Sequence, residues 1–151
     1  MKGGTNTTRR MRKSVEMRLN AVLQYVQKAG TVELVELAKA LGMHRMQVFY
    51  VAKLLDGQLC YKVVGSRALV GRTCADVEER LRKDYNNLVE VVKRRCKRSS
   101  CCVKLRDAVS ALIHRDPNTA DVEYYRALVE IMQGGLALFK FSGKMLVCVR
   151  G

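Results

Sequence analysis

A set of polar side chains between residues 44 and 53 has the composition of a surface that reads DNA. Arginine can form two hydrogen bonds with guanine, glutamine can do the same with adenine, and tyrosine and lysine can bind phosphates. The surrounding apolar spacing predicts one helix here, and we expect these side chains to line its solvent-facing side. A solvated helix face without a nucleic-acid partner is the alternative interpretation. The candidates are His44, Arg45, Gln47, Tyr50 and Lys53.

Three further groups of basic residues could bind phosphates. One flanks the tip of an expected hairpin, one lies in an expected flexible arm over residues 1–13, and one forms a secondary patch near a helix end. Protein arms and hairpins can lie along the phosphate backbone of DNA or enter a narrow minor groove. Each phosphate that they neutralise releases counterions, which makes the affinity depend on salt. General solubility, or complementing the helix dipole at the patch, are the alternatives. The groups are Lys62, Arg67 and Arg72; Arg9, Arg10, Arg12 and Lys13; and Lys93, Arg94, Arg95, Lys97 and Arg98.

Regular elements that could position these groups are recognisable in residues 14–72. A helix is expected to begin at Thr31, a good N-cap, and to end at Gly42, which tolerates a positive φ. Its apolar residues recur at helical spacing, as do those of the helix that follows. A first helix over 15–28, a third helix over 44–56 and strands over 59–64 and 68–72 complete the expected order.

This succession resembles the winged helix-turn-helix superfamily. The residues that carry the resemblance are 37–48, with the sequence LAKALGMHRMQV, and 53–57, with the sequence KLLDG. The resemblance implies a recognition helix at 44–56 and a wing at 59–72, which in most members bind duplex DNA. A minority of winged helices serve as protein-interaction or dimerisation modules, so function has to be argued from the site.

Residues 73–151 repeat the pattern of the first half. We expect a linker helix over 75–97, helices over 100–113 and 120–133, and a hairpin made by 136–141 and 145–150. Chance similarity between amphipathic segments is the alternative. The predicted fold is therefore mainly α with small β-hairpins (α+β), arranged as a module over 14–72 that binds DNA and a winged-helix-like module over 73–151.

The second module differs from the first in charge. Its third helix is expected to turn Asp121, Glu123, Tyr124 and Glu130 to solvent, relieved mainly by Arg126. Residues 1–72 contain 13 basic and 4 acidic side chains, whereas residues 73–151 contain 15 and 10. Because carboxylates repel phosphates, we expect this module to pack, to form a homodimer or to bind a protein partner.

The amino-acid composition limits which partners and which cellular location we expect. The formal net charge is +14 over 151 residues, and such a charge favours polyanionic partners. No apolar run long enough for a membrane span and no secretion signal is recognisable, so we expect no membrane contact and a cytoplasmic, nucleoid-associated location. The six cysteines lack the spacing of common zinc sites, which favours buried thiols or one or two disulfides over a metal, and disulfides inside cells suggest a hyperthermophilic source.

The sequence contains no recognisable catalytic constellation and no motif for a cofactor. We therefore expect a double-stranded DNA-binding transcription regulator and no enzyme. Met46 and Phe49, near the exposed side of the reading helix, fit contacts with thymine methyls, burial under the hairpin or a protein interface. Two alternatives remain open: an interaction module of a replication, segregation or transcription assembly, and a sequence-tolerant architectural protein.

Overall fold

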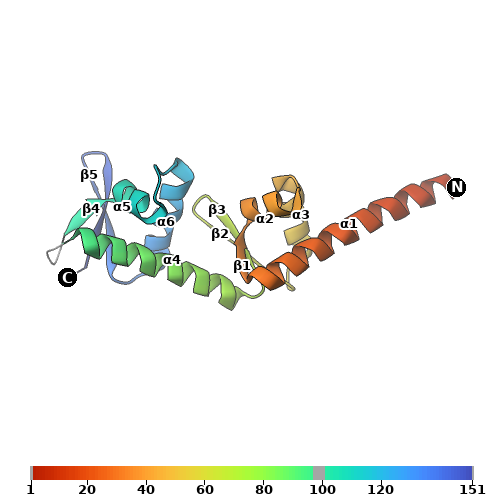
Figure 1. Ribbon diagram of the computed structural model, residues 1–151, viewed down its shortest axis with the longest axis horizontal. Coiled ribbons are helices and arrows are strands. Elements are labelled where there is room, and N and C mark those ends of the chain that lie inside the picture. The colour runs from red at the N-terminus through yellow and green to blue at the C-terminus, as the bar shows by residue number, and fades with distance from the viewer. Residues whose placement is uncertain (1, 97–100, 151) are drawn as a thin grey trace. The chain divides into compact units, whose positions relative to one another are not determined.

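The computed structural model describes residues 2–96 and 101–150, with the side chains of residues 14–96 and 101–150 (Figure 1). These residues form an α+β protein with six helices and two three-stranded antiparallel sheets. The chain divides into two compact units. The first comprises residues 1–62 and 68–77, and the second comprises residues 63–67 and 78–151. The expected α+β class is confirmed.

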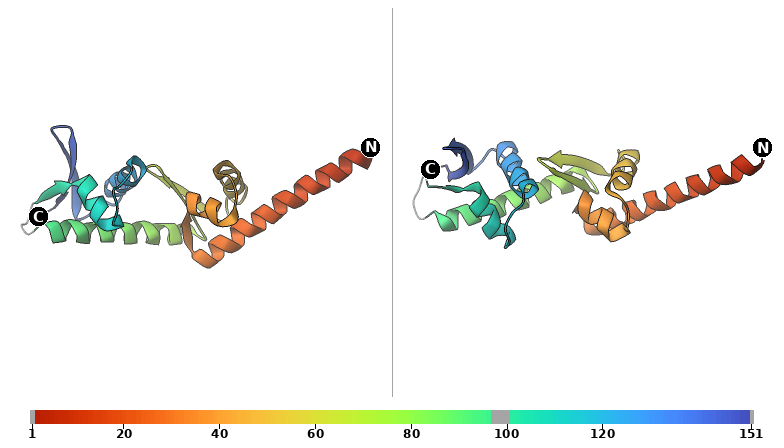
Figure 2. Two further views of the ribbon diagram at one scale, coloured as in Figure 1. Left: turned by 45° about the horizontal axis from the view of Figure 1, so that its top comes forward. Right: turned by 90° about the horizontal axis from the view of Figure 1, so that it is seen from above.

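The first unit contains a long helix, a short strand, two helices and most of a hairpin. Its sheet has the strand order β1-β3-β2, and Val32 of β1 lies opposite Val70 of β3. Figure 2 shows α1 as one continuous helix. The elements are α1 (Lys2–Ala29), β1 (Thr31–Glu33), α2 (Leu34–Leu41), α3 (Arg45–Leu54), β2 (Cys60–Val64) and β3 (Arg67–Gly71).

The core of the first unit brings together apolar side chains from each of its helices. Val22 and Val26, one turn apart on α1, are fully buried in the same cluster as Leu37 of α2 and Val48 of α3. Full burial of such a side chain stabilises the fold by about 1.5–3 kcal/mol. Gly42 caps α2 with a φ of 62°, so the chain turns sharply and α3 begins three residues later.

Two expectations for this unit need correction. Thr31 does not cap a helix: it pairs with Gly71 in the sheet, and α2 starts only at Leu34. The segment expected to be a flexible arm is helical from Lys2 and continues without a break into the rest of α1. Good helix formers from Arg9 onward, with no proline, allow this extension.

The second unit repeats the succession of helix, strand, two helices and hairpin. Its strand order, β4-β6-β5, matches that of the first sheet, with the short strand next to the last one. The N-terminal turn of the helix expected over 100–113 is instead a strand, because Val103 pairs with Val147 of the hairpin. The elements are α4 (Cys74–Arg95), which starts in the first unit, β4 (Cys102–Lys104), α5 (Leu105–Ile113), α6 (Thr119–Ile131), β5 (Leu136–Phe141) and β6 (Lys144–Val149).

A row of residues on α4 supports the core of the second unit. Leu81, Tyr85, Leu88 and Val92 are buried at helical spacing. The hydroxyl oxygen of Tyr85 accepts a hydrogen bond from the backbone N–H of Leu136 at 3.1 Å, which ties the start of β5 to α4.

All six cysteines form disulfides, more than the one or two expected. The pairs are Cys60–Cys74, Cys96–Cys101 and Cys102–Cys148. The last pair joins residues that face each other across β4 and β6. Within the part of the chain that the structure describes, no cluster of ligands suited to a metal ion is present. Among the same residues, no helix is both long and apolar enough to pass through a membrane.

Candidate nucleic-acid interface

The start of α3 is closed by two of the candidate reading residues. Nδ1 of His44 accepts a hydrogen bond from the backbone N–H of Met46 at 3.2 Å, and Oε1 of Gln47 accepts one from the backbone N–H of His44 at 3.1 Å. This reciprocal pair satisfies amide groups that a helix start leaves without partners. Gln47, one of the expected base-contacting residues, therefore also has a structural role at the start of α3.

The face of α3 that remains exposed is basic and partly aromatic. Arg45, Tyr50 and Lys53 are exposed, while Val48 and Val51 on the opposite side are buried. This division places the three polar candidates together on the surface of the first unit. A helix with such a face has the shape and the donors for a major groove.

The side chain of Lys53 lies against an aromatic pair. Its Nζ is 5.5 Å from the ring centre of Phe49 and 5.0 Å from that of Tyr61, and the two rings meet edge to face at 5.7 Å. Such cation–π contacts hold a cation near the surface without neutralising it. Phe49 is partly buried and its ring packs against Tyr61 of the hairpin, which agrees with one of the three roles expected for it.

An apolar stripe runs along the same exposed side of α3. Met46, Tyr50 and Leu54 follow one another at intervals of four residues, with exposed fractions of 65%, 60% and 48%. Met46 was expected near the exposed side of this helix but the stripe was not predicted, although its four-residue spacing is visible in the sequence.

Arg67, at the tip of hairpin β2–β3, is largely buried and already paired. Arg67 belongs to the second unit, where it forms an ion pair with Asp121 of α6, and its side chain is only 16% exposed. Its guanidinium also lies 4.5 Å from the ring centre of Tyr124. The expected DNA contact of Arg67 does not fit this arrangement, because contact with a phosphate would require breaking a largely buried ion pair.

Asp121 is the centre of this buried polar cluster. Besides Arg67, the Arg115 guanidinium donates to both carboxylate oxygens, at 2.8 and 3.2 Å, and the backbone N–H of Asn118 donates at 3.0 Å. Burial by itself would raise the pKa of Asp121, but these hydrogen bonds from Arg115, Asn118 and Arg67 hold it below its ordinary value. The expectation that Asp121 faces solvent is wrong, since only 3% of the residue is exposed.

Tyr124 is likewise buried, contrary to the expectation of a solvent-facing residue. Its hydroxyl donates a hydrogen bond to the Asp84 carboxylate, and burial together with that carboxylate raises its pKa above the ordinary value. Burial first, then the charge of Asp84, raises the pKa of the neighbouring Tyr125 to about 12. Both tyrosines therefore stay neutral as packing groups beneath the hairpin tip.

Gly65 shows how closely the hairpin tip lies against α6 (Figures 1 and 2). Its φ is +58°, and an added Cβ would come within 2.5 Å of the backbone oxygen of Glu123. Both the turn and the close approach require glycine at this position.

The other basic candidates are scattered. Arg72 is half exposed and forms an ion pair with Asp76 at 2.7 Å, and Lys62 is half buried on β2. The described part of the secondary patch, Lys93, Arg94 and Arg95, is exposed at the end of α4. Lys97 and Arg98 lie outside the described residues, as do the side chains of Arg9, Arg10, Arg12 and Lys13.

The fold and surface define a protein of two α+β units, the first of which exposes a basic helix. No protein-family model matches the chain, and no curated protein sequence matches it. The structure is similar to the crystal structure of a hypothetical protein from Pyrobaculum spherical virus, with a TM-score of 0.67 and 12% sequence identity. The match covers 91% of this chain and 95% of that chain, so the two proteins share a fold.

Proposed function

We propose that this chain is a transcription regulator that binds double-stranded DNA through the first of two winged helix-turn-helix modules. The same succession of elements and the same strand order in both units support the assignment of two such modules. In that arrangement the third helix of each module is the recognition helix, and the hairpin after it is the wing. These helices are α3 and α6.

The observation that carries the proposal is the exposed basic face of α3. Insertion of this face into a major groove would bring Arg45, in the first turn, to base edges, with Tyr50 and Lys53 at phosphates. Val48 and Val51, buried on the opposite side, pack α3 against the core of the first unit. Arg67 is not one of the proposed DNA contacts, because it forms an ion pair with Asp121.

A binding assay with a matched charge control tests the proposal. Duplexes are first selected from a randomised pool, and affinity is then measured by fluorescence anisotropy for the wild type, Arg45→Ala and Arg82→Ala. Arg82 is exposed on α4 and serves as a control for the loss of one positive charge. We expect Arg45→Ala to weaken binding by about 1–3 kcal/mol and to relax the preference at one base position. Arg82→Ala should weaken binding less and leave the sequence preference unchanged, because loss of one exposed charge affects all duplexes alike.

Equal effects of the two substitutions would contradict a reading role for α3. A steep dependence on salt without any sequence preference would instead identify an architectural protein. A homodimer is part of the proposal, and selected sites should then contain two half-sites about one helical turn apart. Sedimentation of the protein with such a site would measure the stoichiometry.

One observation favours a second candidate, a protein-interaction module. The apolar stripe formed by Met46, Tyr50 and Leu54 is unusual for a helix that faces phosphates, and amphipathic helices commonly bind apolar grooves through such spacing. No duplex binding at low salt by the folded protein would favour this candidate over DNA binding.

A further inference from the structure

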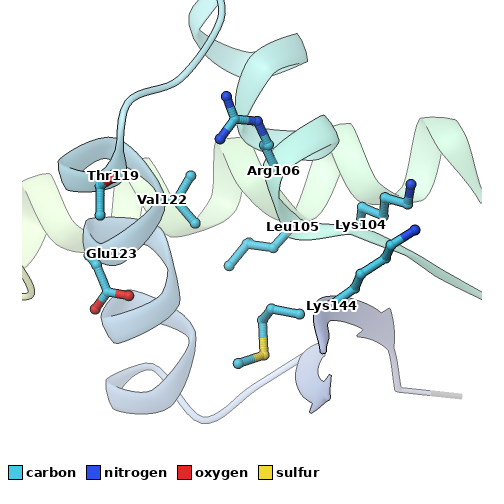
Figure 3. Close-up of a pocket in the computed structure, with 8 residues that line it drawn as sticks. Lys104, Leu105, Arg106, Thr119, Val122, Glu123 and Lys144 are labelled. Carbon is cyan, nitrogen blue, oxygen red and sulfur yellow. The ribbon is translucent and has the colours of Figure 1, made fainter. Parts of the chain in front are cut away.

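The second unit contains a surface pocket with an apolar floor and a cationic side. Its volume is about 450 Å³, within the range of sites that accept small organic ligands. Figure 3 shows it between the start of α5, the first turns of α6 and the start of β6. The lining residues are Lys104, Leu105, Arg106, Thr119, Val122, Glu123, Lys144 and Met145.

Two lysines supply the positive charge of this pocket. Lys104 of β4 lies opposite Leu146 of β6, so Lys144, two residues before Leu146, is its diagonal neighbour on the same face of the sheet. Figure 3 shows both side chains extending on the side of the pocket away from Glu123. Both are exposed, and neither forms an ion pair with a carboxylate among the described residues.

The other two charged residues of the pocket are already neutralised. Arg106 forms an ion pair with Asp116 at 3.1 Å. Glu123 accepts hydrogen bonds from the Arg126 guanidinium, which lower its pKa below the ordinary value. The two ammonium groups therefore remain the uncompensated charges, next to a floor formed by Leu105, Val122 and Met145.

We propose that this pocket binds a small amphipathic anion, a molecule with one carboxylate head and an apolar body of medium-chain length. The head would lie between Lys104 and Lys144, where a negative charge separates two like charges that otherwise repel each other. The apolar body would cover the floor and release water from it. This ligand proposal does not rest on the proposal that α3 binds duplex DNA.

Methyl NMR with decanoate as the probe tests this site directly. In protein labelled at the methionine methyl groups, the Met145 signal is assigned by its loss in Met145→Leu. We expect decanoate to shift the Met145 signal saturably and to leave the signal of Met46, exposed on α3, unchanged. Decanol, which has the same chain and no charge, is expected to bind more weakly. Equal shifts of both methionines, no shift at Met145 or equal affinity for decanol would overturn the proposal.

Two variants separate the contributions of charge and shape. Lys104→Gln with Lys144→Gln is expected to weaken decanoate binding about tenfold, because two exposed ion pairs with the carboxylate are lost. The matched double variant Lys39→Gln with Lys83→Gln, at exposed positions outside the pocket, should bind decanoate like the wild type. Val122→Phe, which fills the pocket, should abolish the Met145 shift. Unchanged decanoate binding in the first variant, with loss of duplex affinity, would make the lysines phosphate contacts and overturn the proposal.

Discussion

The third helices of the two units, α3 and α6, begin in the same way and end up in different environments. Each starts with a reciprocal cap, made by His44 and Gln47 in α3 and by Asn118 and Asp121 in α6. Beyond the cap, α3 keeps a basic face exposed. On α6, the tip of hairpin β2–β3 covers Asp121 and Tyr124 through Arg67 and Gly65.

This difference shows that two helices with the same kind of cap can lie in different surroundings. The same capping chemistry that starts α3 becomes part of a buried ion cluster in α6, because Asp121 also accepts hydrogen bonds from two arginines. A helix with its face covered cannot enter a groove. Reading DNA would then be the task of the first unit, and the second unit would be free for other ligands.

Removal of the disulfides is expected to have the largest effects, one in each unit. Cys102–Cys148 joins positions 46 residues apart, and Cys60–Cys74 joins positions 14 apart. Constraint of the unfolded chain grows with loop length, so replacing the first pair by alanines should cost about 4 kcal/mol and the second pair about 3 kcal/mol. Denaturant unfolding under oxidising conditions measures both. A larger loss of unfolding free energy on replacing Cys60 and Cys74 than on replacing Cys102 and Cys148 would contradict this prediction.

The buried ion cluster on α6 is expected to contribute almost as much. Asp121→Ala should lower the free energy of unfolding by about 3 kcal/mol, because two arginines lose the carboxylate they surround. Glu130→Ala, which removes an exposed ion pair with Arg126, is the control and should cost less than about 1 kcal/mol. Similar losses in the two variants would show that the cluster is not effectively buried.

The pH dependence of the same cluster sharpens this test. The pKa of Asp121 is lower in the folded protein than its ordinary value of 3.8, so its stabilising contribution is complete above 3.8 and is lost as the pH falls through the lower, folded value. Asp121→Asn should therefore lose less stability than the wild type between pH 5 and pH 2. Parallel pH profiles of the two proteins would exclude a stabilising charge at this position.

The two hairpin turns give a matched pair of smaller effects. Gly65 and Gly143 both have positive φ, but an added Cβ meets the Glu123 backbone at Gly65 and nothing within 4 Å at Gly143. Gly143→Ala should cost about 1 kcal/mol for the backbone conformation alone, and Gly65→Ala about 2–3 kcal/mol because contact with α6 is lost as well. Thermal unfolding measures both changes, and equal costs would mean that the tip is not held against α6.

The smallest expected effect is on duplex affinity. Tyr50→Ala should weaken binding about fivefold, the equivalent of one lost hydrogen bond of about 1 kcal/mol. Ile131→Ala, at an exposed apolar position on α6, is the control and should leave the affinity unchanged. Anisotropy with the same selected duplex measures both variants. If Ile131→Ala weakens binding as much, both helices contribute to the duplex contact and the proposed division of tasks is wrong.

The sequence alone determined most of the local structure. Apolar residues at helical spacing predicted α2, α3 and α6 to within a few residues, and β5 was predicted with its observed bounds, Leu136–Phe141. Gly42 was predicted to end a helix and does so. These features depend on the geometry of a short stretch of chain, so nearby residues contain the information.

Only the tertiary structure decided which distant segments meet. Thr31 and Val103 lie in strands because of partners about 40 residues away in the chain, at Gly71 and Val147. Asp121 and Arg67 are charged, and from the sequence both were expected at the surface. In the structure they form a largely buried ion pair at the hairpin tip. The pairing of the cysteines likewise depends on which of them the fold brings close together. A polar side chain is compatible with solvent or with a buried partner, and the choice depends on what approaches it in space.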